Sequence, residues 1–164
     1  MSVLNIAGIV KESVVDGPGF RVVVFTQGCP RHCPGCHNPE LIPRTGGREM
    51  TPRALLDTIK ENVTPLTRGI TFSGGDPLLQ ADALLEAVKL VREEFPQFDI
   101  WVYTGYTFEE VKDLPVLRYI DVLVDGPFLE AQKDMNLAFR GSANQRLIDV
   151  KQTLKSGRVS CLSL

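Results

Sequence analysis

The sequence has no excess of charge of either sign and no long hydrophobic run. Its 164 residues include 18 Lys and Arg against 20 Asp and Glu, a net charge of −2, so it lacks the overall positive charge typical of nucleic-acid binding. No stretch approaches the roughly 20 apolar residues needed to cross a bilayer. The first residues carry neither a basic flank before an apolar run nor a small-residue cleavage site, which argues against a secretory signal. We therefore expect a cytoplasmic protein that binds neither nucleic acid nor membrane.

Repeats, low-complexity tracts and long runs of one charge are also missing, which argues against a repeat protein or a disordered tail. Hydrophobic residues make up 43% and charged residues 23% of the chain, as in an ordinary soluble globular protein. The length predicts one domain over residues 1–164. It excludes a complete eight-fold α/β barrel, which needs about 250 residues.

Cysteine is scarce, but three of the four cysteines are clustered. Cys29, Cys33 and Cys36 have the spacing C-x3-C-x2-C, whereas Cys161 lies alone near the C-terminal end. In a reducing compartment, clustered cysteines are more often metal ligands or catalytic groups than disulfides. Three thiolates on one short loop favour a 4Fe-4S cluster with one iron left open for a non-protein ligand.

Two other interpretations of the cysteine loop stay open at this point. Structural zinc takes four protein ligands, so a zinc site would need His32, His37 or Cys161 to complete its shell. The three thiols could also carry no metal at all. The cysteine spacing by itself does not decide among these.

Short β-rich segments alternate with amphipathic helical segments along the chain. The predicted strands are residues 20–26, 69–73, 99–103 and 120–124, with a further candidate at 147–150. Helices are predicted at 52–63, at 84–95 and after the capping-box pair Thr107 and Glu110. This alternation predicts an α/β fold in which helices cover the outer face of a parallel sheet.

Distinctive segments follow the ends of the first four predicted strands, and they are Gly28-Cys29, Gly74-Gly75-Asp76, Thr104-Gly105-Tyr106 and Asp125-Gly126. In a parallel sheet these ends meet at one edge, where ligands bind. Gly74-Gly75-Asp76-Pro77 is in isolation a good turn sequence. Beside the cysteine loop, however, its glycines would let the backbone approach a ligand closely. The pattern therefore predicts one site at this edge.

Several motifs together resemble a known family. Cys29-Pro-Arg-His-Cys33-Pro-Gly-Cys36 resembles the cluster motif of the radical S-adenosylmethionine enzymes, and Gly74-Gly75-Asp76-Pro77 resembles their glycine-rich motif. Residues 16–21 and 25–29 are similar to the signature of glycyl-radical-enzyme activases. Residues 101–106, 121–128 and 139–145 are similar to the short activases of anaerobic ribonucleoside-triphosphate reductase. The resemblance covers residues 5–150 approximately.

The resemblance implies a fold and a set of cofactor sites. The fold would be an open partial (β/α) barrel of the radical S-adenosylmethionine type. Cys29, Cys33 and Cys36 would ligate a 4Fe-4S cluster that keeps one open iron. The residues implied to bind S-adenosylmethionine are Ser73, Gly74, Gly75, Asp76, Tyr106 and Asp125. No catalytic side chain is implied beyond the cluster and the cofactor.

The resemblance also implies an activity. A radical S-adenosylmethionine oxidoreductase of this kind would cleave its cofactor reductively and use the 5′-deoxyadenosyl radical to generate a glycyl radical on a partner enzyme. The implied partner is anaerobic ribonucleoside-triphosphate reductase, and a reducing protein such as a flavodoxin would supply the electron. A partial barrel with a wide mouth suits a protein loop as substrate better than a small metabolite.

Alternatives and weaker candidates complete the sequence analysis. A radical enzyme acting on a small molecule, of the deazapurine synthase type, would share the cluster motif. If Cys161 closed the metal shell, the protein would be a non-enzymatic metal-binding or electron-transfer module. His32 and His37 are candidates for tuning the cluster, and Arg21 and Arg140 are candidates for steering a partner. The family pattern often has an aromatic residue where this chain has Gly35, and Glu where it has Asp76.

Overall fold

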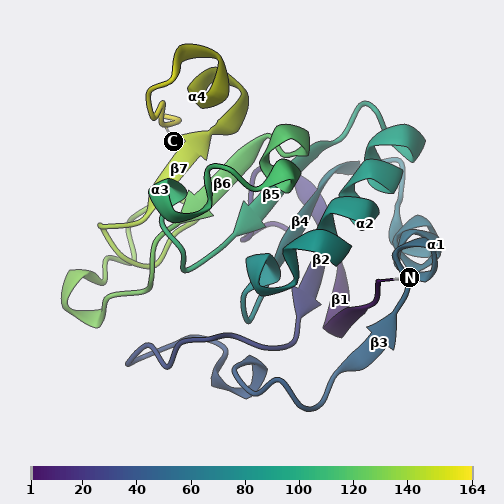
Figure 1. Ribbon diagram of the computed structural model, residues 1–164, viewed down its shortest axis with the longest axis horizontal. Coiled ribbons are helices and arrows are strands. Elements are labelled where there is room, and N and C mark those ends of the chain that lie inside the picture. The colour runs from purple at the N-terminus through teal and green to yellow at the C-terminus, as the bar shows by residue number, and fades with distance from the viewer. Residues whose placement is uncertain (1, 164) are drawn as a thin grey trace.

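A seven-stranded sheet forms the centre of the computed structural model, which describes residues 2–163. Its strands lie in the order β3-β1-β2-β4-β5-β6-β7 (Figure 1). In chain order they are β1 Leu4–Ser13, β2 Phe20–Thr26, β3 Arg48–Met50, β4 Thr67–Gly74, β5 Asp99–Tyr103, β6 Val122–Asp125 and β7 Arg146–Asp149.

The four central strands, β2, β4, β5 and β6, are parallel to one another, which confirms the α/β prediction for the middle of the sheet. The edges differ, because β1 pairs antiparallel with both β2 and β3, and β7 pairs antiparallel with β6. Residues 14–19 alone join β1 to β2. That connection is too short for the crossover of about a dozen residues that a parallel pair requires, so the two strands form a hairpin.

The helices are α1 Pro52–Asn62, α2 Ala81–Glu94, α3 Phe108–Val111 and α4 Val150–Ser156, with 3-10 turns at η1 Pro39–Leu41, η2 Pro77–Gln80, η3 Pro115–Tyr119 and η4 Glu130–Gln132. The Thr51 side chain caps α1 by accepting a hydrogen bond from the Ala54 amide, and α3 opens with the predicted capping box. α3 is shorter than a usual crossover helix, and Leu114 before Pro115 is already extended, as residues preceding proline prefer. Within residues 2–163 no helix is both long and apolar enough to cross a bilayer.

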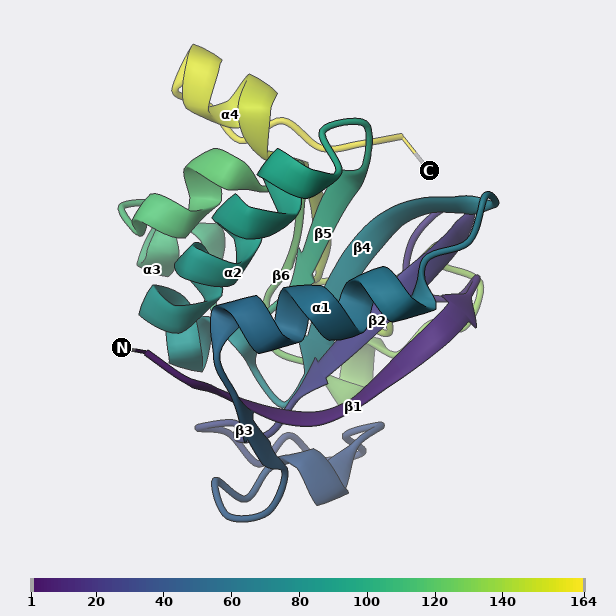
Figure 2. The same ribbon diagram turned by 90° about the vertical axis from the view of Figure 1, so that its right-hand side faces the viewer.

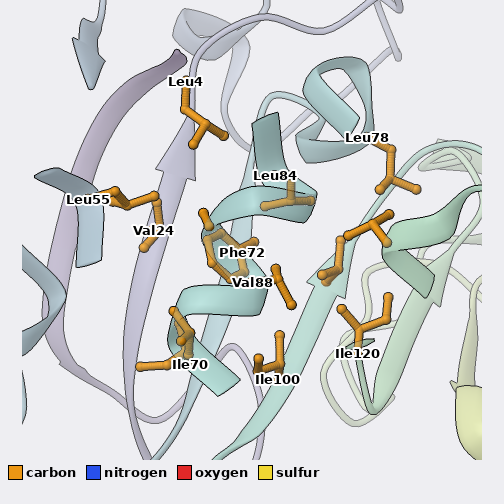
Figure 3. Close-up of a cluster of buried hydrophobic side chains, with 14 of the residues drawn as sticks. Leu4, Val24, Leu55, Ile70, Phe72, Leu78, Leu84, Val88, Ile100 and Ile120 are labelled. Carbon is orange, nitrogen blue, oxygen red and sulfur yellow. The ribbon is translucent and has the colours of Figure 1, made fainter. Parts of the chain in front are cut away.

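The helices cover one face of the sheet and bury the main hydrophobic core against it. In Figure 2, α1 lies in front of β2 and β4, with α2 beside it. Alternate strand residues point to this face, among them Ile70, Phe72 and Ile100, all fully buried. Figure 3 shows Leu84 and Val88 of α2 among these side chains. Burying each such side chain contributes about 1.5–3 kcal/mol to the free energy of unfolding. Because alternate residues of a strand point to the same face, the face that carries the apolar residues is the one that packs against the helices.

The opposite face of the sheet, called here the inner face, is covered by loops. A second cluster forms there around Trp101, which packs edge-on against Phe139 with ring centroids 5.5 Å apart. The Tyr103 hydroxyl donates to the Phe139 carbonyl at 2.7 Å. On the same face, the Thr71 hydroxyl of β4 donates to the Asp16 carbonyl of the loop before β2 at 2.8 Å. The loops at 14–19 and 126–145 therefore fold over the strands and leave a cavity beneath them.

Arg21 is fully buried on this inner face. Its guanidinium pairs with Asp99 at 2.7 Å and donates from Nε to the Thr71 hydroxyl, also at 2.7 Å. The expectation that Arg21 steers a partner protein is therefore wrong. The strand alternation places this side chain under the 14–19 loop, where its charge holds the strands and the loop together.

Candidate functional site

A cavity of about 650 Å³ lies at the carboxyl ends of the parallel strands and extends over the inner face. Its size is typical of a site for a small organic molecule. It is lined by residues that follow each central strand, including Cys29 after β2, Gly75 after β4, Gly105 after β5 and Gly126 after β6. The prediction that these segments converge at one edge is confirmed.

The three clustered cysteines all line this cavity. Each is a free thiol, neither fully buried nor fully exposed. The Cys36 amide donates to the Cys33 carbonyl at 3.0 Å, which forms a tight turn between them. Gly35 within that turn has φ +74°, and a Cβ there would lie 3.2 Å from the Phe128 ring. The positive φ and the close approach to Phe128 therefore favour glycine at this position.

The spacing of the thiols bears on the kind of metal site that they could form. Over residues 2–163, no three His, Cys, Asp or Glu side chains gather tightly enough to hold one metal ion. A tetrahedral zinc site requires its ligands to converge on one atom. A four-iron cluster takes each thiolate at a different iron, so its ligands do not have to converge on one atom.

Backbone contacts join the glycine-rich segment to the cysteine loop. The amides of Gly75 and Asp76 donate to the carbonyls of Thr26 and Gly28 at 2.9 and 2.8 Å. Gly74 has φ +117°, and a Cβ on Gly75 would overlap the Gly28 carbonyl oxygen. Both glycines are therefore required by the close approach of two backbones. With the two amides already used, this segment offers a ligand mainly carbonyl oxygens.

Asp76 lies behind the cavity wall. Its carboxylate is fully buried and accepts hydrogen bonds from the Thr104 hydroxyl at 2.8 Å and the Gly105 amide at 2.9 Å. It also pairs with Arg31 at 2.6 Å. The Asp76 carboxylate thus holds neighbouring strand ends together. Its side chain does not line the cavity.

Tyr106 and Asp125, two other residues predicted to bind the cofactor, also have no part in the cavity lining, whereas Ser73, Gly74 and Gly75 do. Asp125 is 1% exposed and pairs with Arg146 at 2.5 Å, and this pairing raises the pKa of the Arg146 guanidinium. The Tyr106 ring lies under the Arg31 guanidinium, with its centroid 4.2 Å from the guanidinium carbon.

Tyr103 was not among the residues predicted to bind the cofactor, but unlike Tyr106 it lines the cavity. Burial raises the pKa of its phenol, so the group stays neutral. Tyr103 is the last residue of β5 and lies two positions after Trp101, so strand alternation places both side chains on the inner face. This alternation is the sequence signal that could have identified Tyr103 as a residue of the cavity.

Two charged residues of the cavity wall bear on what it can bind. Arg140 lines the cavity, and its Nε is buried with no hydrogen-bond partner in the described part of the chain. Asp16 also lines it, and burial raises the pKa of this carboxyl, against the lowering effect of the Ser13 hydroxyl and Arg21. An unmatched guanidinium donor favours an anionic group on the ligand.

The remaining sequence candidates are placed as follows. His37 lines the cavity and packs on Phe128 with ring centroids 5.0 Å apart. His32 is not part of the lining. Cys161 is exposed, bridges to Ile148 of β7 through its backbone, and does not line the cavity either.

The sequence model of the family described as "4Fe-4S single cluster domain" matches residues 15–148, which include the cysteine loop and all four central strands. The chain therefore belongs to the single-cluster 4Fe-4S proteins. It is 42% identical over 140 residues to a protein of Vibrio cholerae, covering 80% of this chain and 89% of that one. It is 40% identical over 139 residues to a protein of Enterobacteria phage T4, covering 81% and 86%. A protein of Escherichia coli K12 is 42% identical over 139 residues, covering 80% and 90%.

Each of these three relatives is named anaerobic ribonucleoside-triphosphate reductase-activating protein. At this identity and coverage the chain belongs to the family of anaerobic ribonucleoside-triphosphate reductase-activating proteins.

Proposed function

We propose that this protein is a glycyl-radical-enzyme activase of the radical S-adenosylmethionine type. The observation that carries the proposal is that the C-x3-C-x2-C thiols and the residues Ser73, Gly74 and Gly75 line the same cavity. When bound, a reduced 4Fe-4S cluster would supply the electron for cleaving S-adenosylmethionine, and the resulting 5′-deoxyadenosyl radical would take a hydrogen atom from a glycine of the partner. The protein's own part is to bind, orient and shield these groups.

Cys29, Cys33 and Cys36 are the proposed ligands, and one iron stays open because the cavity supplies no fourth thiol. Cys161 is exposed and outside the cavity lining, so the closed-site alternative gains no support. With three thiolate ligands, the cluster would keep one coordination position for a non-protein ligand, and the cavity that the cysteines line would hold that ligand.

The amino-acid end of S-adenosylmethionine matches the polar groups of the cavity. Carbonyl oxygens of the Gly74-Gly75 segment accept hydrogen bonds, as an ammonium group requires. The orphaned Nε of Arg140 would donate to a carboxylate. Cofactor binding would depend only indirectly on three of the predicted residues, which lie outside the cavity lining and position the strand ends that form it: Asp76, Tyr106 and Asp125.

The partner is proposed to be an anaerobic ribonucleoside-triphosphate reductase, as the names of the relatives indicate. Exposed apolar side chains at the cavity favour a protein substrate over a small molecule, because Val15 is 71% exposed and Met135 is 87% exposed, and both line the cavity. Exposed apolar groups that adjoin a binding cavity are typical of interaction surfaces. A flavodoxin-like protein would deliver the electron.

The proposal extends to the type of fold, the number of domains and the location. The curved sheet, with helices on one face and the cavity on the other, is proposed to be an open partial (β/α) barrel. One sheet includes strands from Leu4 to Asp149, which supports a single domain over residues 1–164. A cytoplasmic location is proposed because the clustered thiols are unpaired and would need reducing conditions.

Anaerobic reconstitution with iron and sulfide tests the proposal. We expect a brown protein that, once reduced, releases 5′-deoxyadenosine from S-adenosylmethionine and produces a glycyl radical signal in electron paramagnetic resonance when the reductase is added. Cys36→Ser should lose cluster binding, whereas the matched control Cys161→Ser should keep the wild-type iron content. A colourless zinc protein, or loss of metal in Cys161→Ser, would refute the proposed function.

A further inference from the structure

Arg31 lies inside the cysteine motif, between Cys29 and Cys33, and its side chain extends past the Cys29 sulfur to the glycine-rich segment. Its Nη1 is 2.6 Å from the Asp76 carboxylate and 4.0 Å from the Cys29 sulfur. The guanidinium carbon lies 4.2 Å from the centroid of the Tyr106 ring. One cation therefore contacts a cysteine of the cluster loop, the acidic residue of the glycine-rich segment and an aromatic ring after β5.

These contacts make Arg31 a fixed charge. Its side chain is only 21% exposed, and it is held by an ion pair with a fully buried carboxylate and by stacking on a ring. The path of the side chain also depends on Gly105, since a Cβ at that position would lie 2.5 Å from Nη1 of Arg31. A charge held in this way keeps a constant position relative to the Cys29 sulfur.

We propose that Arg31 is a positioning residue that fixes the cysteine loop against the Asp76 segment and makes the cluster easier to reduce. The inference rests on the proposed function, because it concerns the cluster of that same site. Reduction adds one negative charge to the cluster, and a cation held beside Cys29 stabilises that charge. The same contact couples the cluster loop to the glycine-rich segment that would bind the cofactor.

Substitutions can separate the effect of the Arg31 charge on cluster reduction from its effect on the position of the cysteine loop. Arg31→Gln removes the charge and the ion pair with Asp76. Arg31→Lys keeps a charge near Cys29 but loses the planar group that both pairs with Asp76 and stacks on Tyr106. Gly105→Ala keeps the arginine at position 31 but displaces its guanidinium group, because the added Cβ would overlap Nη1. Gly105 is not among the residues of positive φ, so alanine fits the backbone there.

The experiment compares wild-type protein with these variants after anaerobic reconstitution, by iron and sulfide content, by redox titration followed by electron paramagnetic resonance, and by equilibrium binding of S-adenosylmethionine. The matched control is Arg44→Gln. Arg44 is exposed, and its Cγ would lie 3.5 Å from a Cβ on Gly28. The substitution Arg44→Gln therefore removes one positive charge beside the same loop without touching the contacts of Arg31.

We expect Arg31→Gln to lower the equilibrium constant for cluster reduction about tenfold, a shift of about 59 mV to more negative potential for one electron, and to weaken cofactor binding about tenfold. Arg31→Lys should recover most of the potential but little of the binding, and Gly105→Ala should lose both in part. Arg44→Gln should match the wild type. Wild-type potential and binding in Arg31→Gln would overturn the inference, as would equal shifts in Arg44→Gln. If Arg31→Gln fails to load, Arg31→Lys and Gly105→Ala decide between the same outcomes. A wild-type protein that forms no cluster would instead refute the proposed function.

Discussion

Replacing Gly75 with alanine tests whether the backbone contact between the glycine-rich segment and the cysteine loop stabilises the protein. The added Cβ would overlap the Gly28 carbonyl oxygen and would lie 2.7 Å from the Leu41 carbonyl oxygen. Both obstacles are backbone atoms, so no side-chain rotation relieves them. The segments at the ends of β2 and β4 would have to separate.

The cost has two parts. Overpacking of a tight contact costs about 1–3 kcal/mol. Separation also breaks the 2.8 Å hydrogen bond from the Asp76 amide to the Gly28 carbonyl, and a buried donor left unpaired costs about 1–3 kcal/mol. The free energy of unfolding should therefore fall by about 2–6 kcal/mol. This is a large fraction of the roughly 5–15 kcal/mol that stabilises a typical domain.

Urea unfolding of the metal-free chain with reduced thiols, followed by circular dichroism, measures the effect. With a slope of about 2 kcal/mol per molar urea, the midpoint should fall by about 1–3 M. Gly8→Ala is the matched control, because Gly8 lies in β1 and a Cβ there meets nothing within 4 Å. Iron loading after reconstitution should also drop in Gly75→Ala, since Gly28 leads directly into Cys29. Equal midpoints for the two variants would refute the reasoning.

Two further predictions concern acid stability and partner binding. Burial raises the pKa of the Asp121 carboxyl, but hydrogen bonds from Arg92 and Lys151 outweigh that effect and hold the pKa below its usual range. A carboxyl whose folded-state pKa is lowered stabilises the protein above its unfolded-state pKa and loses that contribution as pH falls through the folded value. The stability gap between wild type and Asp121→Asn, measured by thermal unfolding, should stay constant from pH 7 to about 5 and shrink below about 4; a gap that is independent of pH would contradict this. Met135→Asp should raise the KM for the reductase about tenfold, because burying a methionine contributes about 1.5–3 kcal/mol, whereas Leu66→Asp, at a residue 67% exposed and outside the cavity lining, should not; equal KM values would argue against docking at this surface.

Local sequence patterns predicted much of the secondary structure. The strands at 20–26 and 99–103 have the predicted bounds, and the Thr107–Glu110 capping box is present. These features depend on side-chain alternation and on hydrogen bonds within one turn. The strands β1 and β3 and the helix α4 were not predicted. β3 and α4 have only three and seven residues, which carry too little periodicity to stand out from loops, and the ten residues of β1 alternate between buried and exposed positions only at its start.

The direction of polar side chains at the site was harder to predict. Asp125 and Tyr106 follow strand ends, as cofactor-binding residues often do, but Asp125 pairs with Arg146, 21 residues away, and Tyr106 lies beneath Arg31. Each outcome depends on a partner that is distant in sequence. Sequence reasoning therefore located the edge of the sheet that forms the site and could not assign every side chain at that edge.

The sequence by itself determined the cysteine motif, the glycine-rich segment and the central strands that bring them to one edge. These follow from residue spacing and from alternation along each strand, both of which are local. Only the tertiary structure decided that loops 14–19 and 126–145 cover the inner face, that Arg21 is buried, and that Arg31 reaches Asp76 across 45 positions of the chain. The reason is that burial and ion pairing depend on which distant segments meet, and that depends on the packing of the whole chain.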